Sequence, residues 1–220
     1  SPLRQIMTTT TAPEKSTASI RWLASATSQT WLDQANAHPM KVLIDHAHCE
    51  RKAAGAAVQM MFRYLCEPGL GEALSPLARE ELEHFEQVLA VLQSKGRYLE
   101  PLPAPAYGGE LARRIRKGEP ERMLDSFLVS GLIEARSHER MALLAEHSSD
   151  PELRALYGNL LASEARHFGL YWTLAENRWP RDQIVSRLKE LAELETSALT
   201  GELNRPEDVR MHSVGIVVPD

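Results

Sequence analysis

The sequence predicts an all-α protein built on a four-helix bundle, with a long crossover between two helical hairpins and extra helices at the flanks. Apolar residues recur at helical spacing over several long segments. Clusters of proline and glycine separate these segments, notably at Pro68-Gly69 and across residues 97–109. No segment shows the alternating pattern of a strand. With 220 residues, one helical domain is expected over 18–200, between a disordered tail at 1–17 and a C-terminal tail at 201–220.

Caps and breakers along the chain predict the helix boundaries. Pro39 fits the first turn of a helix that reaches about Tyr64. Ser75-Pro76 is expected to start the next helix, which stops at Gly96. The remaining helices are expected within residues 18–37 (one or two short helices), 110–117, 120–147, 151–177 and 182–198.

Two Glu-x-x-His pairs carry most of the chemical information in this chain. Glu81 with His84, and Glu164 with His167, each lie within a long helical segment. Residues three apart share one face of a helix, so each pair presents a carboxylate and an imidazole to the same side. One such pair is common on helices that bind no metal. Two pairs in corresponding helices favour a metal site.

A glutamate precedes each pair by almost the same distance. Glu50 lies 31 residues before Glu81, and Glu134 lies 30 residues before Glu164. The midpoint of each interval falls at a break between helices, so both antiparallel hairpins bring their carboxylates level. Glu50 and Glu134 also share their stripes with small and apolar residues, where an unpaired charge is costly and a cation is needed.

Four carboxylates and two imidazoles from four helices are the ligand set of a carboxylate-bridged two-metal site in a ferritin-like bundle. Oxygen and nitrogen donors of this kind favour iron or manganese for a paired site. The expected metal ligands are Glu50, Glu81, His84, Glu134, Glu164 and His167. Glu139 is the rival of Glu134, but its stripe, which includes Leu132 and Arg136, is expected to face solvent.

Four nearby side chains are open to two interpretations. His46 and His138 lie one turn from the upstream glutamates and could support metal ligands, although ordinary buried or partly exposed histidines are the simpler expectation. Tyr157 and Tyr171 could line a pocket, with core packing as the simpler expectation.

The composition is that of an ordinary soluble protein with an acidic balance. There are 25 Lys and Arg against 30 Asp and Glu, a net charge of −5, so the chain carries no global signal for nucleic acid. No apolar run is long enough to cross a membrane. The two cysteines make no disulfide framework, which favours reduced thiols in the cytoplasm.

One local basic run stands out on this acidic chain. It comprises Arg113, Arg114, Arg116 and Lys117, with Arg122 close behind. A solvated helix face is the usual explanation of such a run, and contact with a phosphate backbone is the functional one.

Together these residues resemble the tRNA-(2-methylthio-N6-isopentenyladenosine) hydroxylase family, whose members are ferritin-like and contain two irons. The resemblance covers roughly residues 35–200. It is carried by residues 43–57 (LIDHAHCERKAAGAA), 80–86 (EELEHFE), 125–140 (DSFLVSGLIEARSHER) and 161–168 (LASEARHF).

The resemblance implies an O2-dependent monooxygenase that hydroxylates the isopentenyl side chain of a hypermodified adenosine next to the tRNA anticodon. It implies two iron ions in a carboxylate-bridged centre on the six ligands named above, with O2 as co-substrate. An external electron donor is also expected, because the chain has no flavin or nicotinamide motif. The expected partners of this cytoplasmic monomer are then an electron-transfer protein and the tRNA anticodon loop, for which the basic run is a candidate contact.

A ferritin-like protein that oxidises or stores iron is the alternative, because it would use the same ligands. The long Pro-rich crossover, the additional helix at 182–198 and the basic segment at 110–117 argue against such a cage-forming protein.

Overall fold

The computed structural model describes residues 21–200 and 208–214. In this part of the chain every regular element is a helix, which confirms the all-α prediction. The helices are α1 (Gln29–Ala37), α2 (Pro39–Arg63), α3 (Leu70–Ser94), α4 (Ala106–Arg114), α5 (Glu121–His147), α6 (Pro151–Glu176) and α7 (Arg181–Thr200). No helix within the described ranges is long and apolar enough to cross a membrane. The tail expected at 1–17 lies outside the described residues.

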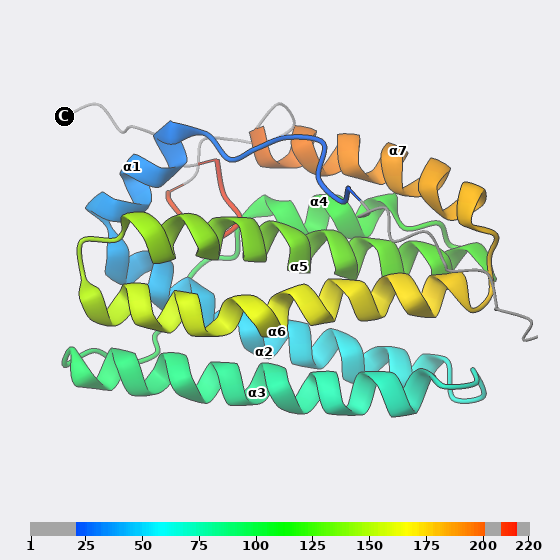
Figure 1. Cartoon of the computed structure of the whole chain (residues 1–220), viewed down its shortest axis with the longest axis horizontal. Helices are drawn as coiled ribbons and strands as arrows, with labels where there is room; N and C mark the ends of the chain where they lie inside the picture. Colours follow the sequence, from blue (N-terminus) through cyan, green and yellow to red (C-terminus); the bar gives the residue numbers. More distant parts are fainter. Residues whose placement is uncertain (1–20, 201–207, 215–220) are drawn as a thin grey trace, which may run out of the picture.

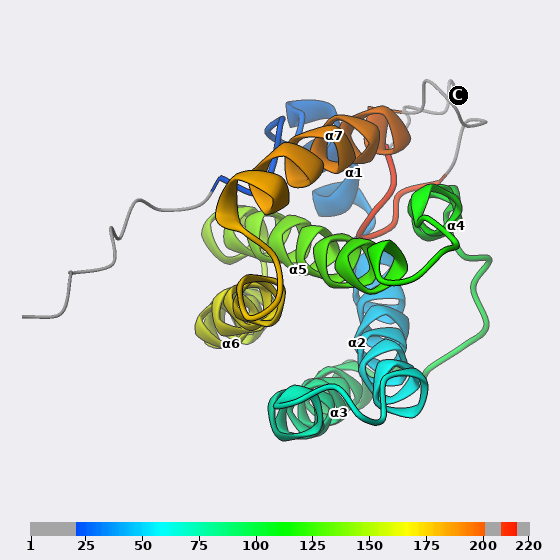
Figure 2. The ribbon, with the colours of Figure 1, turned by 90° about the vertical axis from the view of Figure 1, so that its right-hand side faces the viewer.

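The four long helices α2, α3, α5 and α6 form a ferritin-like bundle (Figure 1). α2 packs along α3 and α5 packs along α6, so both expected hairpins are present. Seen from the end of the bundle, α7 lies over α5, and α4 lies beside α2 and α5 (Figure 2). Because α3 and α5 run in the same direction, residues 95–120 return along the length of the bundle, and α4 lies on this crossover.

The second bundle helix begins earlier than the sequence predicted. α3 starts at Leu70, and Pro76, the expected first residue, lies inside the helix. A proline there leaves the carbonyl of Glu72 without its partner and costs about 3 kcal/mol. Both residues are exposed, so solvent can hydrate that carbonyl. Leu70 and Leu74 are buried by the extra turns, at about 1.5–3 kcal/mol each, which offsets the cost.

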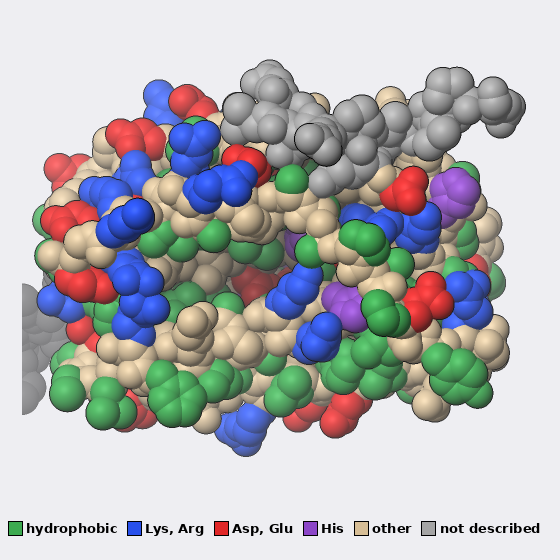
Figure 3. Space-filling view, turned by 180° about the vertical axis from the view of Figure 1, so that it is seen from behind, with side chains coloured by type: hydrophobic (Ala, Val, Ile, Leu, Met, Phe, Trp, Pro, Cys, Tyr) green, Lys and Arg blue, Asp and Glu red, His purple; other side chains and the backbone are tan. Residues whose placement is uncertain are grey.

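The short basic helix also differs from its predicted range of 110–117. α4 begins at Ala106 and ends at Arg114, because Tyr107 and Leu111, one turn apart, are its buried anchors. Arg116 follows the helix in an irregular segment, where its backbone and guanidinium donate to Asp125 at 2.8–3.0 Å. The face of the molecule that carries α4 is hollowed, and Lys and Arg side chains gather on one side of the hollow (Figure 3).

Residues 208–214, within the segment treated above as a C-terminal tail, pack against α2 and α5. Met211 belongs to the hydrophobic core and is fully buried. Its backbone N–H donates to Asp45 at 2.8 Å. Arg140 donates to the carbonyls of Met211 and Ser213 at 2.8 and 2.7 Å. These buried polar contacts fix the segment over the side of the bundle near α4.

A buried ion pair fastens α7 to the bundle. Arg136 on α5 donates to both oxygens of Glu195 on α7, at 2.7 and 2.9 Å, and both side chains are fully buried. Tyr107 donates to the same carboxylate at 3.0 Å, so α4 joins this contact. The expectation that the stripe of Glu139 faces solvent is therefore wrong, because α7 and the segment before α1 cover Leu132 and Arg136.

Removing the Glu195 carboxylate would leave the buried guanidinium of Arg136 without its main partner. We expect Glu195→Ala to lower the free energy of unfolding by about 3–5 kcal/mol. Glu193→Ala, on the exposed side of the same helix, should change it by less than about 0.5 kcal/mol. Urea unfolding followed by circular dichroism measures both variants. Equal stabilities would show that this pair does not hold α7 in place.

Candidate metal centre

The six side chains singled out in the sequence come together inside the bundle. They are Glu50 from α2, Glu81 and His84 from α3, Glu134 from α5, and Glu164 and His167 from α6. Each is at most 5% exposed. The matched spacing of the two hairpins therefore does bring four carboxylates and two imidazoles to one level of the bundle.

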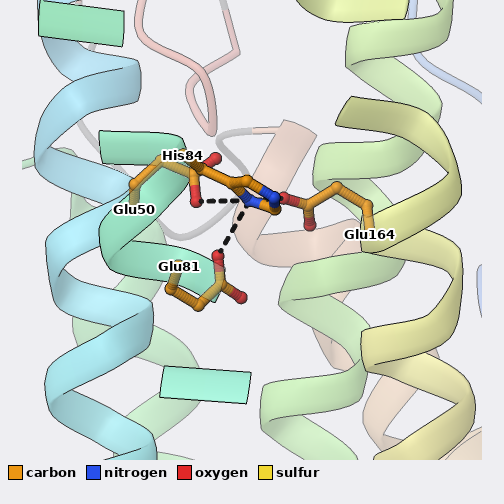
Figure 4. Close-up of side chains that lie close together, drawn as sticks. All are labelled: Glu50, Glu81, His84 and Glu164. Carbon is orange, nitrogen blue, oxygen red and sulfur yellow. Dashed lines mark ion pairs between the residues drawn. The ribbon is translucent and has the colours of Figure 1, made fainter. Parts of the chain in front are cut away.

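These side chains form two overlapping groups of four, and within each group the donor atoms lie within 4.8 Å of one another. One group is Glu50, Glu81, His84 and Glu164, shown in Figure 4. The other is Glu81, Glu134, Glu164 and His167. Glu81 and Glu164 belong to both groups, which is the position of carboxylates that could bridge two ions.

Several donor atoms of this cluster lack hydrogen-bond partners among the described residues. They are both oxygens of Glu81, Oε2 of Glu164, and Nδ1 of His84 and His167. His167 Nδ1 lies 2.8 Å from Glu81 Oε1, close enough for an ion pair but without hydrogen-bond geometry. Buried polar atoms are normally satisfied, so five such atoms in one place point to a shared ligand. Oxygen and imidazole nitrogen are the donors that iron or manganese would use.

The buried charges shift the ionisation of the cluster. Burial raises the pKa of Glu134 to about 8, and the charge of Glu81 adds to this effect. Burial, followed by the charges of Glu134 and Glu50, raises the pKa of Glu164 well above its usual value. Burial alone would lower the pKa of His84, but Glu50 and Glu81 outweigh it and raise that pKa to about 10. Protons on these groups balance the carboxylate charge, and bound metal ions would displace them.

His46 holds Glu50 from outside the cluster. Its Nε2 lies 2.7 Å from Glu50 Oε1, and its ring stacks on Tyr157 with centroids 5.6 Å apart. Burial tends to raise the pKa of Glu50, but the hydrogen bond with His46 and the nearby imidazole of His84 outweigh this and bring it to about 2. His46 therefore supports a cluster carboxylate, the role that the sequence had left as the less simple one, whereas Tyr157 packs in the core against His46, as expected.

Glu80 is a partner that the sequence analysis missed. Its Oε2 lies 2.6 Å from His167 Nε2, and it also accepts hydrogen bonds from Ser163 and Arg166. Burial would raise the pKa of Glu80, but its hydrogen bonds with Arg166 and His167 outweigh this and bring it to about 2. A carboxylate on the outer nitrogen fixes the ring so that Nδ1 faces the cluster. In the sequence, the adjacent glutamates Glu80 and Glu81 were the only sign that a second carboxylate lies near His167.

Glu139 and His138 lie outside the two groups of donor atoms. Glu139 accepts hydrogen bonds from the Thr27 backbone and from Arg136, both at 2.9 Å. The ring of His138 packs edge-on against Phe168, with centroids 5.7 Å apart. Of the two rival glutamates on α5, only Glu134 lies in the cluster.

A cavity of about 380 Å³ reaches the cluster from the hollowed face in Figure 3. Glu134 and Tyr171 line it, which places its inner end at the cluster. Burial raises the pKa of Tyr171, so its hydroxyl stays protonated. The other lining residues are mostly small or apolar: Cys49, Lys52, Ala53, Ala56, Ala104, Pro105, Tyr107, Gly108, Gly109, Ser130, Ile133 and His212.

A groove of about 910 Å³ adjoins this cavity on the same face. Cavity and groove share Ala56, Gly108, Ser130 and Ile133. The basic side chains that line the groove are Arg63, Arg113, Arg116, Lys117 and Arg122. Arg114, the remaining residue of the predicted basic run, does not line it, and its backbone carbonyl accepts a hydrogen bond from Arg187 at 3.2 Å.

This chain is similar in sequence to known proteins over most of its length. Residues 15–213 match the family model described as tRNA-(MS[2]IO[6]A)-hydroxylase (MiaE). The chain belongs to this family. Among curated relatives, the tRNA 2-(methylsulfanyl)-N(6)-isopentenyladenosine(37) hydroxylase of Pseudomonas putida is 38% identical over 87% of this chain and 92% of the relative. The enzyme of that name from Salmonella typhimurium is 28% identical over 88% of both chains.

A solved structure is also similar. It is described as protein 43 with aldehyde deformylating oxygenase activity from Synechococcus. It is 78% identical to this chain and superposes with a TM-score of 0.86, covering 91% of this chain and 100% of that one. Membership of a tRNA hydroxylase family sets aside the iron-storage alternative, and the Synechococcus protein adds a second oxygenase activity to consider.

The two glutamates on α5 allow a direct test of the ligand set. Glu134→Ala should weaken iron binding by at least about tenfold, because it removes a donor from one group of four. Glu139→Ala should keep the iron content of the unchanged protein, since its partners are Arg136 and Thr27. Elemental analysis after reconstitution with ferrous iron measures both, with circular dichroism as the check on folding. The reverse pattern would remove Glu134 from the ligand set.

Proposed function

We propose that this protein is a di-iron monooxygenase that hydroxylates the isopentenyl side chain of 2-(methylsulfanyl)-N6-isopentenyladenosine beside the tRNA anticodon. The main support for this function is an apolar cavity that has the carboxylate–imidazole cluster at its inner end and a basic groove at its outer end. The family match supports the same reaction.

The residues of the cluster fit two iron ions. Glu81 and Glu164 would bridge them, with Glu50 and His84 completing one site and Glu134 and His167 the other. Bound iron would supply the activation of O2. In the overall reaction, one oxygen atom of O2 enters a C–H bond of the substrate, and the other becomes water with two electrons from an external donor and two protons. We propose an electron-transfer protein as that donor and a monomer as the working form.

The protein's own part is to hold the substrate and to keep water away. A volume of about 380 Å³ is near the lower end of the range of small-molecule sites, about 300–1,000 Å³, which suits one modified base. The walls at Ala53, Ala56 and Ile133 suit the hydrocarbon side chain. Tyr171 and Ser130 line the cavity and offer hydroxyl groups beside Glu134.

An aldehyde deformylating oxygenase is the second candidate, and one observation favours it. The Synechococcus protein described with this activity is 78% identical to this chain. The same metal ligands and apolar cavity could serve an aldehyde, because a fold and its metal site host more than one oxygenation. An uncharged aldehyde would not need the basic groove, whereas the phosphates of tRNA would bind there. The tRNA reaction therefore remains our first proposal.

The two reactions differ in their products, which makes the test direct. Iron-loaded protein, O2 and a chemical reductant would be incubated with tRNA that carries the isopentenyl group, or with a long-chain aldehyde. We expect the modified nucleoside to gain the mass of one oxygen atom, measured by mass spectrometry after digestion. His167→Ala should abolish this gain. A hydrocarbon one carbon shorter than the aldehyde, with tRNA unchanged, would establish the second candidate instead.

The basic groove predicts a second result, on tRNA affinity. Arg113→Glu with Lys117→Glu should weaken tRNA binding and lower the slope of log affinity against log salt by about 2, with iron content intact. Arg116 is left unchanged because it pairs with the buried Asp125. Arg181→Glu with Lys189→Glu is the matched control, because these residues lie outside the groove. Filter binding across a salt series measures both, and equal effects of the two double variants would argue against docking in this groove.

A further inference from the structure

The junction between cavity and groove is bounded by three helices. Ala56 on α2, Gly108 on α4, and Ser130 and Ile133 on α5 line both spaces. A group passing from the basic groove to the metal cluster has to cross this junction. The side chains there are short, except that of Ile133.

Gly108 and Gly109 are unusual residues for their position. They lie in the first half of the nine-residue helix α4, where glycine is a poor helix former compared with alanine. Neither has the positive φ angle that favours glycine. A Cβ atom built on either residue would meet no other atom within 4 Å, so close packing does not require glycine. The remaining consequence is open space, at the junction for Gly108 and in the adjacent cavity wall for Gly109.

The wall beside the glycines is rigid and flat. Tyr107, next to Gly108, stacks on His212 with ring centroids 4.8 Å apart and planes 7° from parallel. The Tyr107 hydroxyl donates to Glu195 at 3.0 Å, and His212 Nε2 lies 2.8 Å from Ser137 Oγ. Both rings line the cavity, and these hydrogen bonds hold them in the wall beside the space that the glycines leave.

We propose that Gly108 at the junction, with Gly109 beside it in the cavity wall, forms the port through which a nucleobase of tRNA, turned out of its stack, passes from the groove into the cavity. This inference rests on the proposed tRNA substrate. Enzymes that act on a base have to take it out of the stack, and splayed loop bases are the usual targets in RNA. A planar base that is still joined to its backbone needs a slot free of side chains, with the phosphates held in the groove outside.

Side chains added at the junction should block this passage. Gly108→Leu on α4 and Ala56→Leu on α2 narrow the port from opposite sides. Each should lower kcat/KM for tRNA hydroxylation by at least about tenfold, because even a single methylene group in a pocket has effects of this size. Gly55→Leu is the matched control, since Gly55 is exposed on α2, lines neither space and has open room for a side chain. Gly108→Ala should raise the thermal midpoint, because alanine favours helix, with a smaller loss of activity.

A direct readout of the base separates blockage from misfolding. An anticodon stem-loop with 2-aminopurine at the target position should change its emission on binding to the unchanged protein. Gly108→Leu should bind the stem-loop and iron as well as Gly55→Leu does, and should lose the emission change. Full hydroxylation by Gly108→Leu would overturn the port alone. Failure of the unchanged protein to bind or hydroxylate tRNA would overturn the proposed function, and the port with it.

Discussion

Burial of four carboxylates together is the constraint on which this structure depends. Carboxylates of the same sign inside a bundle are costly unless protons, imidazoles or metal ions balance them. Burial and the neighbouring carboxylates raise the pKa values of Glu134 and Glu164, as this cost requires. His46 on Glu50 and Glu80 on His167 hold donors from outside, so unpaired donor atoms remain facing one another. The bundle is therefore pre-organised for cations rather than for tight internal packing at this level.

A second set of buried charges places the walls of the cavity. On the side of α4, the cavity that reaches the cluster is lined by α2 and α5 of the bundle together with α4 and His212. Tyr107 and Arg136 meet at Glu195, which ties α4 and α7 to α5. Arg140 ties residues 208–214 to the same helix. Elements far apart in sequence thus come together as one rigid wall, and the access route depends on ion pairs that take no part in metal binding.

The residues of the cluster could be predicted from the sequence, but the cavity that leads to the cluster could not. Helix periodicity and the nearly equal spacing of the two hairpins can be read from the sequence alone, and they were enough to select Glu50 and Glu134. The start of α3 at Leu70 depends on core burial that overrides the signal of Pro76. The burial of Arg136 depends on α7, whose position no local pattern encodes. The contribution of His212 to the cavity was unpredictable for the same reason.

Relatives of this chain carry both names, a tRNA hydroxylase and a protein with aldehyde deformylating oxygenase activity, and one carboxylate–imidazole cluster could serve either reaction. The outer end of the cavity is where this chain favours one substrate over the other. A chain with net charge −5 repels a polyanion unless cations are gathered at one place. Here they gather along the groove that adjoins the cavity, and the junction carries a glycine, Gly108, that neither backbone conformation nor close packing requires. A small aldehyde needs neither feature, whereas a base attached to a phosphate backbone needs both.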